Sequence, residues 1–372
     1  MKRVIEIGQI VAGPTAGLLL SDFGYEVIKI ERPEIGDVSR NLTGTSSGTF
    51  PYYNRGKKSL SIDISTDKGK EILSRLIKTA DIIIENMSPG SMDRLGFSYE
   101  NVKKINEKII YLSIKGYMEG PYHGRKSLDY PIEIESGLAY MTGKYGHPMR
   151  MGASIVDMVA AILGVTRIFN MIGNNEHGFV EIGLFETAMF LAGQHIATYQ
   201  IEKKDLPPIN EKNFAWGVYD YFMTSDNKKI FIAVSSDGQW KDFCRAFSMA
   251  PMFIGNEYMA NNLRYEKRDI LIPEIQKKLI LMKFEDIIKI LLKYNISYAA
   301  VNKPWDLLSD KQAIKYMVNV KYKNNDYTVP ALPFMHAENM DAPKLGSDNY
   351  AILAELGYNV NEIDEISKEN CI

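Results

Sequence analysis

The chain has 372 residues, too many for one simple core, so we expect one large and one smaller domain. Its 44 basic and 46 acidic residues give a formal charge of −2, which argues against a nucleic-acid or membrane partner. The two cysteines, Cys244 and Cys371, lie far apart and indicate a reduced, cytoplasmic protein. The five histidines form no close pair, so no metal site is expected.

Strand and helix patterns alternate through the first half of the chain. Strands are expected at residues 4–7, 25–31, 81–85, 109–114 and 179–184. Helices are expected at residues 13–24, 67–80, 154–173 and 186–199, with a short one after Ser98. Strands that alternate with helices in this way form βαβ units and a parallel sheet. The chain starts too close to its first strand for a signal peptide, and the apolar run near 155–165 looks too short to span a bilayer.

The alternation stops in a polar, proline-containing linker at about 202–214. Beyond it we expect a hairpin of strands 218–223 and 229–234, followed by helices at 238–248, 270–281 and 284–293. Strands at 317–321 and 327–329 come next, and a helix at 350–356 follows.

A dinucleotide-binding site is the first function that a βαβ unit suggests, with Glu31 holding a ribose. The fingerprint for such a site is G-x-G-x-x-G. Gly8, Gly13 and Gly17 are spaced four or five residues apart instead. The spacing therefore argues against an oxidoreductase that uses a nicotinamide or flavin cofactor.

Asp157 stands out at the start of the apolar helix. With Ser154 as the N-cap, Asp157 takes the third helical position, where the helix dipole favours a carboxylate over the acid. A nucleophilic carboxylate must be ionised. Acidic residues in a first helical turn are also common stabilisers, and Ser-x-x-Asp resembles a capping box. Position alone leaves both interpretations open.

An ordered set of motifs runs along nearly the whole chain. It includes Val11-Ala-Gly-Pro, Asp22-Phe-Gly-Tyr-Glu-Val-Ile-Lys-Ile-Glu-Arg-Pro with Gly36-Asp37, Asn54-Arg-Gly-Lys-Lys-Ser-Leu-Ser-Ile-Asp, Asp93-Arg94-Leu95-Gly96, Ser113-Ile-Lys-Gly-Tyr and Ala342-Pro-Lys-Leu-Gly. In these motifs the sequence resembles the family III CoA-transferases, and Asp157 matches the position of their catalytic aspartate.

The resemblance implies an enzyme of the EC 2.8.3 type that moves coenzyme A between an acyl-CoA and a small carboxylic acid. The CoA would pass through an aspartyl-CoA thioester, with CoA as a substrate and no prosthetic group. The implied fold is α/β, with two chains interlocked in a homodimer. Each chain would have a Rossmann-like large domain at 1–200, completed by 330–372, and a small α+β domain at 215–315.

The resemblance also implies a CoA site. Arg32 and Arg94 are the expected phosphate ligands, since guanidinium groups bind phosphate bidentately, although Arg94 has Asp93 beside it as an alternative ion-pair partner. Positions that line the adenine and pantetheine are Val11, Ala12, Ile62, Asn86 and Met87. Strand-end packing is the alternative role for Ile62. Lys126 lies where relatives place a phosphate-binding lysine, with a solvated charge as the alternative.

Departures from the family pattern bear on the activity. Racemases of this fold use a histidine where this chain has Leu128, which cannot exchange a proton, so only Asp129 or Tyr130 lies near enough to replace it. Formyl-CoA transferases carry glutamine at the position of Val11 and a glycine-rich loop that is missing here. Oxalate is therefore not the expected acceptor. A non-catalytic CoA-binding protein is a further alternative, which would keep Arg32 and Arg94 but would not need Asp157. The sequence does not identify the two carboxylic acids between which CoA is transferred.

Overall fold

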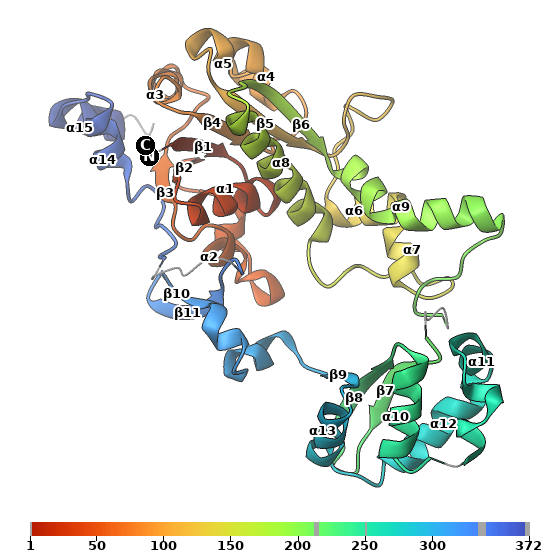
Figure 1. The fold of residues 1–372 in the computed structure, drawn as a ribbon. Helices are drawn as coiled ribbons and strands as arrows, with labels where there is room; N and C mark the ends of the chain where they lie inside the picture. Colours follow the sequence, from red (N-terminus) through yellow and green to blue (C-terminus); the bar gives the residue numbers. More distant parts are fainter. Residues whose placement is uncertain (1, 212–215, 250, 334–339, 369–372) are drawn as a thin grey trace. The chain divides into compact units, whose positions relative to one another are not determined.

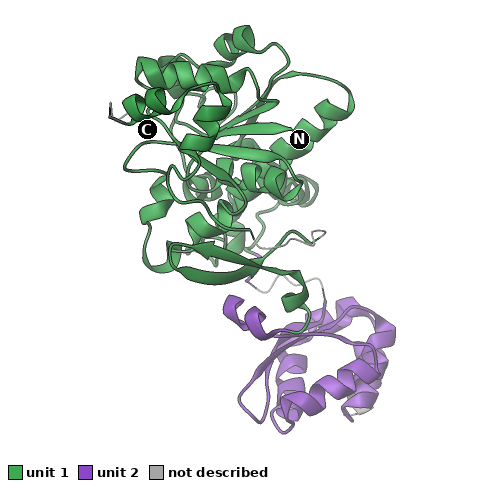
Figure 2. Cartoon of the chain, turned by 90° about the vertical axis from the view of Figure 1, so that its left-hand side faces the viewer, with its two compact units in different colours: residues 1–208, 311–372 green, residues 209–310 purple. Residues whose placement is uncertain are grey.

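The computed structural model describes residues 2–211, 216–249, 251–333 and 340–368. The chain divides into two compact units (Figure 2). Unit 1 comprises Met1–Pro208 together with Lys311–Ile372, and unit 2 comprises Ile209–Asp310. The chain therefore leaves unit 1 once and returns to it.

Unit 1 is built on a six-stranded parallel sheet in the order β3-β2-β1-β4-β5-β6 (Figure 1). The strands are β1 (Arg3–Ile7), β2 (Glu26–Glu31), β3 (Lys58–Ser61), β4 (Ile82–Glu85), β5 (Ile110–Lys115) and β6 (Gly178–Gly183). Val4 pairs with Val27 on one side and with Ile82 on the other. The expected parallel sheet is confirmed. Because the strand order reverses direction between β1 and β4, a ligand crevice is expected at the carboxyl ends of these two strands.

Alternate strand residues bury into two separate cores, one on each face of the sheet. On the first face, Val4 and Ile82 pack with α1 (Ala12–Asp22) and α8 (Ile155–Gly173). On the second face, Ile5 and Ile83 pack with α3 (Asp67–Ile77), α5 (Tyr99–Ile105), α14 (Asn349–Glu355) and α15 (Val360–Lys368). Both faces are covered, which explains why the strands read as continuous apolar runs.

The remaining elements of unit 1 lie in the connections. They are α2 (Thr49–Tyr53), α4 (Ser91–Leu95), α6 (Asp129–Glu135), α7 (Leu138–Thr142), α9 (Leu184–Glu202), β10 (Met317–Tyr322) and β11 (Asn325–Pro330). The returning segment fastens to the edge of the sheet. Asp348 accepts the N–H of Ser59 at 2.9 Å, and Asn349 accepts the N–H of Ser61 at 2.8 Å.

Unit 2 has an antiparallel sheet of β7 (Val218–Met223), β8 (Lys229–Val234) and β9 (Ser297–Ala300). Its helices are α10 (Asp237–Ala246), α11 (Asn261–Glu266), α12 (Arg268–Leu279) and α13 (Phe284–Lys293). Its core gathers around the fully buried Trp240, whose indole N–H donates to the carbonyl of Phe253 at 3.0 Å. A buried indole with its N–H paired is a stable centre for a small core.

One expectation about α8 is wrong. The helix is 19 residues long with a mean hydropathy of 1.8, so among the described residues it alone is long and apolar enough to cross a membrane. The apolar segment continues beyond residues 155–165 to Gly173, which makes it longer than expected. A core helix meets the same criterion, so the finding is weak evidence for a membrane span.

Candidate active site

Two adjoining pockets open at the carboxyl ends of the central strands. The first, of about 370 Å³, is lined by Ile7, Gly8, Gln9, Ile30, Glu31, Arg32, Gly36, Asp37, Ile62, Asp63, Ile64, Ser65, Met87, Ser91, Arg94 and Leu95. The second, of about 350 Å³, is lined by Gln9, Ile10, Val11, Ala12, Asn86, Met87, Ser88, Pro89, Ile114, Lys115, Gly116, Arg125, Lys126, Ser127, Leu128, Asp157 and Leu184. Gln9 and Met87 line both pockets, so they form the boundary between them.

The structure brings every predicted site residue to one of these pockets. Arg32, Ile62 and Arg94 line the first pocket. Val11, Ala12, Asn86, Lys126 and Asp157 line the second, and Met87 lines both. The two expected phosphate ligands Arg32 and Arg94 thus line one pocket, and Asp157 lines the adjoining one.

The two arginines of the first pocket keep their guanidinium groups available. In the part of the chain that the structure describes, neither Arg32 nor Arg94 forms an ion pair within 4.0 Å. Asp63 of the same pocket does interact with Arg32, because hydrogen bonds with Ser65 and then the charge of Arg32 lower the pKa of Asp63. Arg94 donates a hydrogen bond to the hydroxyl of Ser91 at 2.9 Å. The alternative ion pair between Arg94 and Asp93 is absent there. Unpaired guanidinium groups in a pocket wall are suited to phosphate.

The loop between β1 and α1 forms the common wall of the pockets. The amide of Asn86 clamps it, accepting the N–H of Gln9 at 2.8 Å and donating to the carbonyl of Gln9 at 3.0 Å. Gly13 lies so close that an added Cβ would meet Asn86 Oδ1 at 2.8 Å and Gly8 Cα at 3.0 Å. Gly8 and Gly13 therefore allow the loop, helix α1 and the end of strand β4 to approach closely. This packing accounts for the two glycines without a bound dinucleotide.

Asp157 lies in the first turn of α8, but the cap of this helix differs from the predicted one. The hydroxyl of Ser154 makes no cap hydrogen bond and instead accepts from Arg150 at 3.0 Å. The buried Asp129 of α6 provides the cap, with Oδ1 accepting the N–H of Val156 at 3.0 Å and of Asp157 at 3.2 Å. The predicted Ser154 cap is therefore wrong, because a carboxylate from another helix occupies its position.

Burial raises the pKa of Asp157 from 3.8 to about 7, the negative charge of Asp129 adds to the increase, and Arg150 opposes it. The expected effect of the helix dipole, which would favour the carboxylate and lower the pKa, is therefore wrong in direction. Desolvation and a like charge outweigh the dipole at this position. Asp157 is thus about half ionised near pH 7.

Two of the three residues considered for a racemase, Leu128 and Asp129, are arranged unfavourably for proton transfer, while the role of Tyr130 stays untested. The Leu128 side chain is 66% exposed and apolar. The carboxylate of Asp129 accepts two backbone N–H groups and lies 3.3 Å from Arg150, so its oxygens are engaged. A residue that must exchange a proton needs a free position facing the substrate.

Sequence reasoning assigned no role to several residues of the second pocket, namely Gln9, Ile10, Lys115, Arg125, Ser127 and Leu184. Lys115 pairs with Glu85 at 2.7 Å and donates to the carbonyl of Met87 at 2.8 Å, which fixes the strand ends. The motif Ser113-Ile-Lys-Gly-Tyr was recognised in the sequence. Because Lys115 ends the central strand β5, its position in that motif could have identified Lys115 as a pocket residue.

Comparison with known proteins agrees with this geometry. Residues 2–349 match the model of CoA-transferase family III. The chain is 28% identical to succinate–glutarate CoA-transferase of Agrobacterium fabrum, covering 95% of this chain and 94% of that protein. It is 41% identical to formyl-CoA:oxalate CoA-transferase of Rhodopseudomonas palustris over 42% of this chain and 38% of that protein.

A solved structure, that of a CAIB/BAIF family protein from Brucella suis, superposes with a TM-score of 0.81 at 26% identity. The match covers 95% of this chain and 98% of that one. The chain belongs to CoA-transferase family III. It is an enzyme that transfers CoA between an acyl-CoA and a carboxylic acid.

Proposed function

We propose that Asp157 is the nucleophile that carries the acyl group and then CoA during the transfer. The observation that supports this role is its position, since Asp157 is the one carboxylate in the lining of the second pocket. Asp157 is half-buried on the first turn of a packed helix, so its carboxylate is presented to the pocket by a rigid element.

The transfer then proceeds by exchange at two carbonyl carbons. The Asp157 carboxylate attacks the thioester carbonyl, the carbon–sulfur bond breaks, and CoA thiolate leaves a mixed anhydride. The thiolate attacks the Asp157 carbonyl, which releases the first acid and leaves an aspartyl-CoA thioester. A second acid reverses these steps. The N–H groups at the start of α8 already donate to Asp129, so the start of α1, where Ala12 lines the pocket, is the better support for an oxyanion.

Hydroxylamine trapping tests the nucleophile. Incubation with an acyl-CoA and then hydroxylamine is expected to leave a hydroxamate on Asp157, detected by mass spectrometry of the peptide that contains it. An adduct on another residue, or none, contradicts the proposal. A racemase would instead wash solvent deuterium into the α-position of a 2-methylacyl-CoA without a second acid.

The chemistry of the second pocket favours a dicarboxylic acyl group. Lys126 was expected to bind a CoA phosphate, but it lines the pocket of Asp157 and not that of Arg32 and Arg94. It forms no ion pair within the described residues, so we assign it to a second carboxylate of the acyl group instead. A relative named for succinate and glutarate supports this class. Rates with a panel of acids and succinyl-CoA test it. Succinate and glutarate are expected to exceed butyrate by at least ~10-fold, since one charge-assisted hydrogen bond contributes about 1.5–3 kcal/mol. Equal rates contradict it.

For the cofactor end of the substrate we propose Arg32 and Arg94 as phosphate ligands. Arg32→Ala and Arg94→Ala are each expected to weaken CoA binding by roughly 1.5–3 kcal/mol, because a charge-assisted hydrogen bond is lost. Calorimetry with CoA and dephospho-CoA measures the change. Arg167→Ala, on the exposed end of α8 with Glu176, is a matched control expected to bind CoA normally. Unchanged affinity in both test variants removes them from the site.

We also propose an interlocked homodimer. Helix α9 exposes large apolar side chains along its length: Met189, Phe190, Ile196, Tyr199 and Ile201, which are 46–77% exposed. A row of this kind marks an interaction surface, and the family resemblance supports a second copy as its partner. Sedimentation at nanomolar concentration is expected to show a dimer, because linked chains cannot separate without unfolding. A folded monomer contradicts it.

A further inference from the structure

Ile10, in the loop between β1 and α1, has an unusual backbone conformation. Its φ is 67°, in the left-handed region, and among the described non-glycine residues with positive φ it alone is β-branched. A β-branched side chain is strongly disfavoured there, and such conformations persist where surrounding contacts impose them. Something in the structure must therefore hold this peptide in place.

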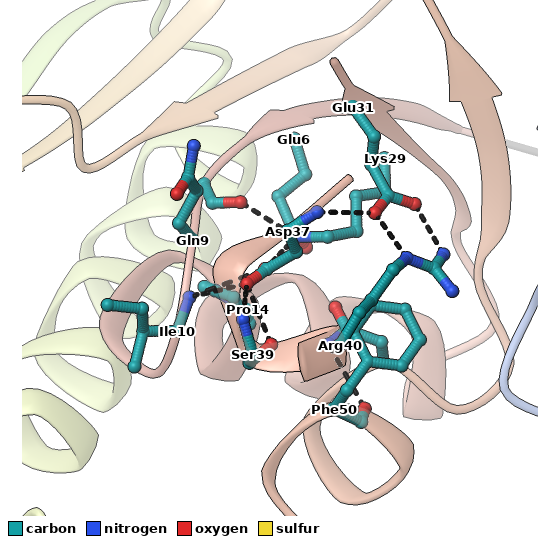
Figure 3. A network of polar contacts seen from close by, with 12 residues as sticks. Glu6, Gln9, Ile10, Pro14, Lys29, Glu31, Asp37, Ser39, Arg40 and Phe50 are labelled. Atoms are coloured by element: carbon teal, nitrogen blue, oxygen red, sulfur yellow. Dashed lines mark hydrogen bonds and ion pairs between the residues drawn. The ribbon is translucent and has the colours of Figure 1, made fainter. Parts of the chain in front are cut away.

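The holding contact is a buried carboxylate. The N–H of Ile10 donates to both oxygens of Asp37, at 3.2 and 3.3 Å (Figure 3). The same carboxylate accepts the N–H and hydroxyl of Ser39 at 2.8 and 2.7 Å, and it pairs with Lys29 at 2.9 Å. The Asp37 and Lys29 side chains are fully buried. Burial works against the charge of Asp37, yet Lys29 and Ser39 outweigh it and hold its pKa below the ordinary value.

Asp37 is one end of a buried chain of charges. Lys29 pairs with Glu6 at 2.8 Å and donates to the carbonyl of Gly8 at 2.7 Å. Glu6 in turn pairs with Lys57 at 2.6 Å, and Lys57 donates to the carbonyl of Pro14 at 2.8 Å. The chain of charges thus fixes the backbone on both sides of the loop, before it at Gly8 and after it at Pro14.

The loop held in this way is the wall that the two pockets share. Gln9 lines both pockets, and Ile10 lines the second one together with Asp157. Asn86 holds Gln9 from one side while Asp37 holds Ile10 from the other. The position of this wall therefore limits the space beside Asp157 in the second pocket.

We infer that Asp37 is a positioning residue for the transfer reaction: it imposes the left-handed conformation of Ile10 and so shapes the pocket wall facing Asp157. This inference rests on the proposed role of Asp157. Asp37 itself lines the first pocket, at the end proposed for the nucleotide, and it reaches the reacting end in the second pocket only through the loop. The expected consequence is on turnover more than on binding, because the wall faces the reacting end of the substrate.

The experiment compares Asp37→Asn, Ile10→Gly and the double variant. Asp37→Asn keeps the shape of the side chain, but its NH2 group replaces one of the two oxygens that accept the N–H of Ile10 and either pair with Lys29 or accept from Ser39, and it cannot accept a hydrogen bond. The variant is expected to lower kcat by at least ~10-fold with KM for succinyl-CoA changed less than ~3-fold. Glycine adopts positive φ without help. In the Ile10→Gly background the Asp37→Asn change is therefore expected to cost less than ~3-fold in kcat, a non-additive result. Lys203→Gly, at another positive φ of 52° at the end of α9, is the control and is expected not to rescue Asp37→Asn.

Equal losses from Asp37→Asn in the two backgrounds overturn the inference, because a purely structural role would not depend on residue 10. If Asp37→Asn does not fold, Ile10→Pro decides, since proline lacks the N–H and cannot adopt positive φ. It is expected to lower kcat by at least ~10²-fold in a folded protein, and wild-type turnover overturns the inference. Hydroxamate formation at Asp157 in the wild type reports on the proposed nucleophile independently of these variants.

Discussion

Asp157→Asn is expected to lower the CoA-transfer rate by at least ~10³-fold, because an amide cannot attack a thioester as a carboxylate does. Steady-state exchange between succinyl-CoA and glutarate measures the loss. Since the amide of asparagine can hydrolyse back to the acid, Asp157→Ala serves as the second variant. Residual exchange within ~10-fold of the wild type in the alanine variant would exclude Asp157 as the nucleophile.

The same asparagine variant is expected to be more stable than the wild type at pH 8. The folded-state pKa of Asp157, about 7, exceeds the ordinary 3.8, so its contribution to stability is complete below pH 3.8 and is lost as pH rises through 7. With 1.36 kcal/mol per pKa unit, the ionised aspartate costs the wild type at most about 4 kcal/mol at pH 8. Asparagine carries no such cost.

Urea denaturation at pH 4 and pH 8 measures this difference. The gain in unfolding free energy is expected to be several times larger at pH 8 than at pH 4. Asp364→Asn, on the exposed surface of α15, is the matched control and is expected to change neither activity nor stability. A gain that is equal at the two pH values would show that Asp157 is not the titrating group.

Asp129→Asn is the second variant for which we expect a large effect. The quantity that is expected to change is the pH dependence of the transfer reaction. In the wild type, kcat/KM is expected to fall about 10-fold per unit below pH 7, as the free enzyme's Asp157 becomes protonated. The charge of Asp129 helps to raise this pKa while Arg150 opposes it. Removing the negative charge is therefore expected to move the acid limb to lower pH. An unmoved limb, or one at higher pH, contradicts this coupling.

Asp129→Ala separates the charge from the cap. Asparagine still offers an oxygen to the N–H groups of Val156 and Asp157, whereas alanine leaves both without an acceptor. Alanine is therefore expected to destabilise the protein by roughly 2–4 kcal/mol, and asparagine by much less. Thermal denaturation of the two variants at pH 5 compares them, and equal losses would mean that the cap contributes little.

The parallel sheet was predictable because its central strands are buried on both faces and so appear as apolar runs. Strand β3 was missed, since Leu60 is the one large apolar residue in Lys58–Ser61 and the strand forms through its pairing with β2. Helix α15 was missed as well, because its apolar positions Val360, Ile363 and Ile366 are too few to identify a helix before the second core is known.

The location of the candidate site residues was predictable, while their roles stay a prediction and their electrostatics could not be predicted. Family resemblance supplied the positions, and the fold brings them to adjoining pockets. Asp129 lies 27 residues before Val156, whose N–H it accepts, and Asp37 lies 27 residues after Ile10, so neither contact follows from local spacing. The pKa of Asp157 depends on its burial and on the charge of Asp129, and neither can be read from a sequence pattern.

The return of the chain to unit 1 has a consequence for how the protein is made. The partner of Ser59 at the sheet edge, Asp348, lies 289 residues further along the chain. At ~5–20 residues per second, the ribosome needs roughly 15–60 s to deliver it. During that interval β3 presents an unpaired edge, which is a template for pairing with other chains. Assembly of this enzyme is therefore governed by late, long-range contacts, and its nascent form is the state in most need of protection from aggregation.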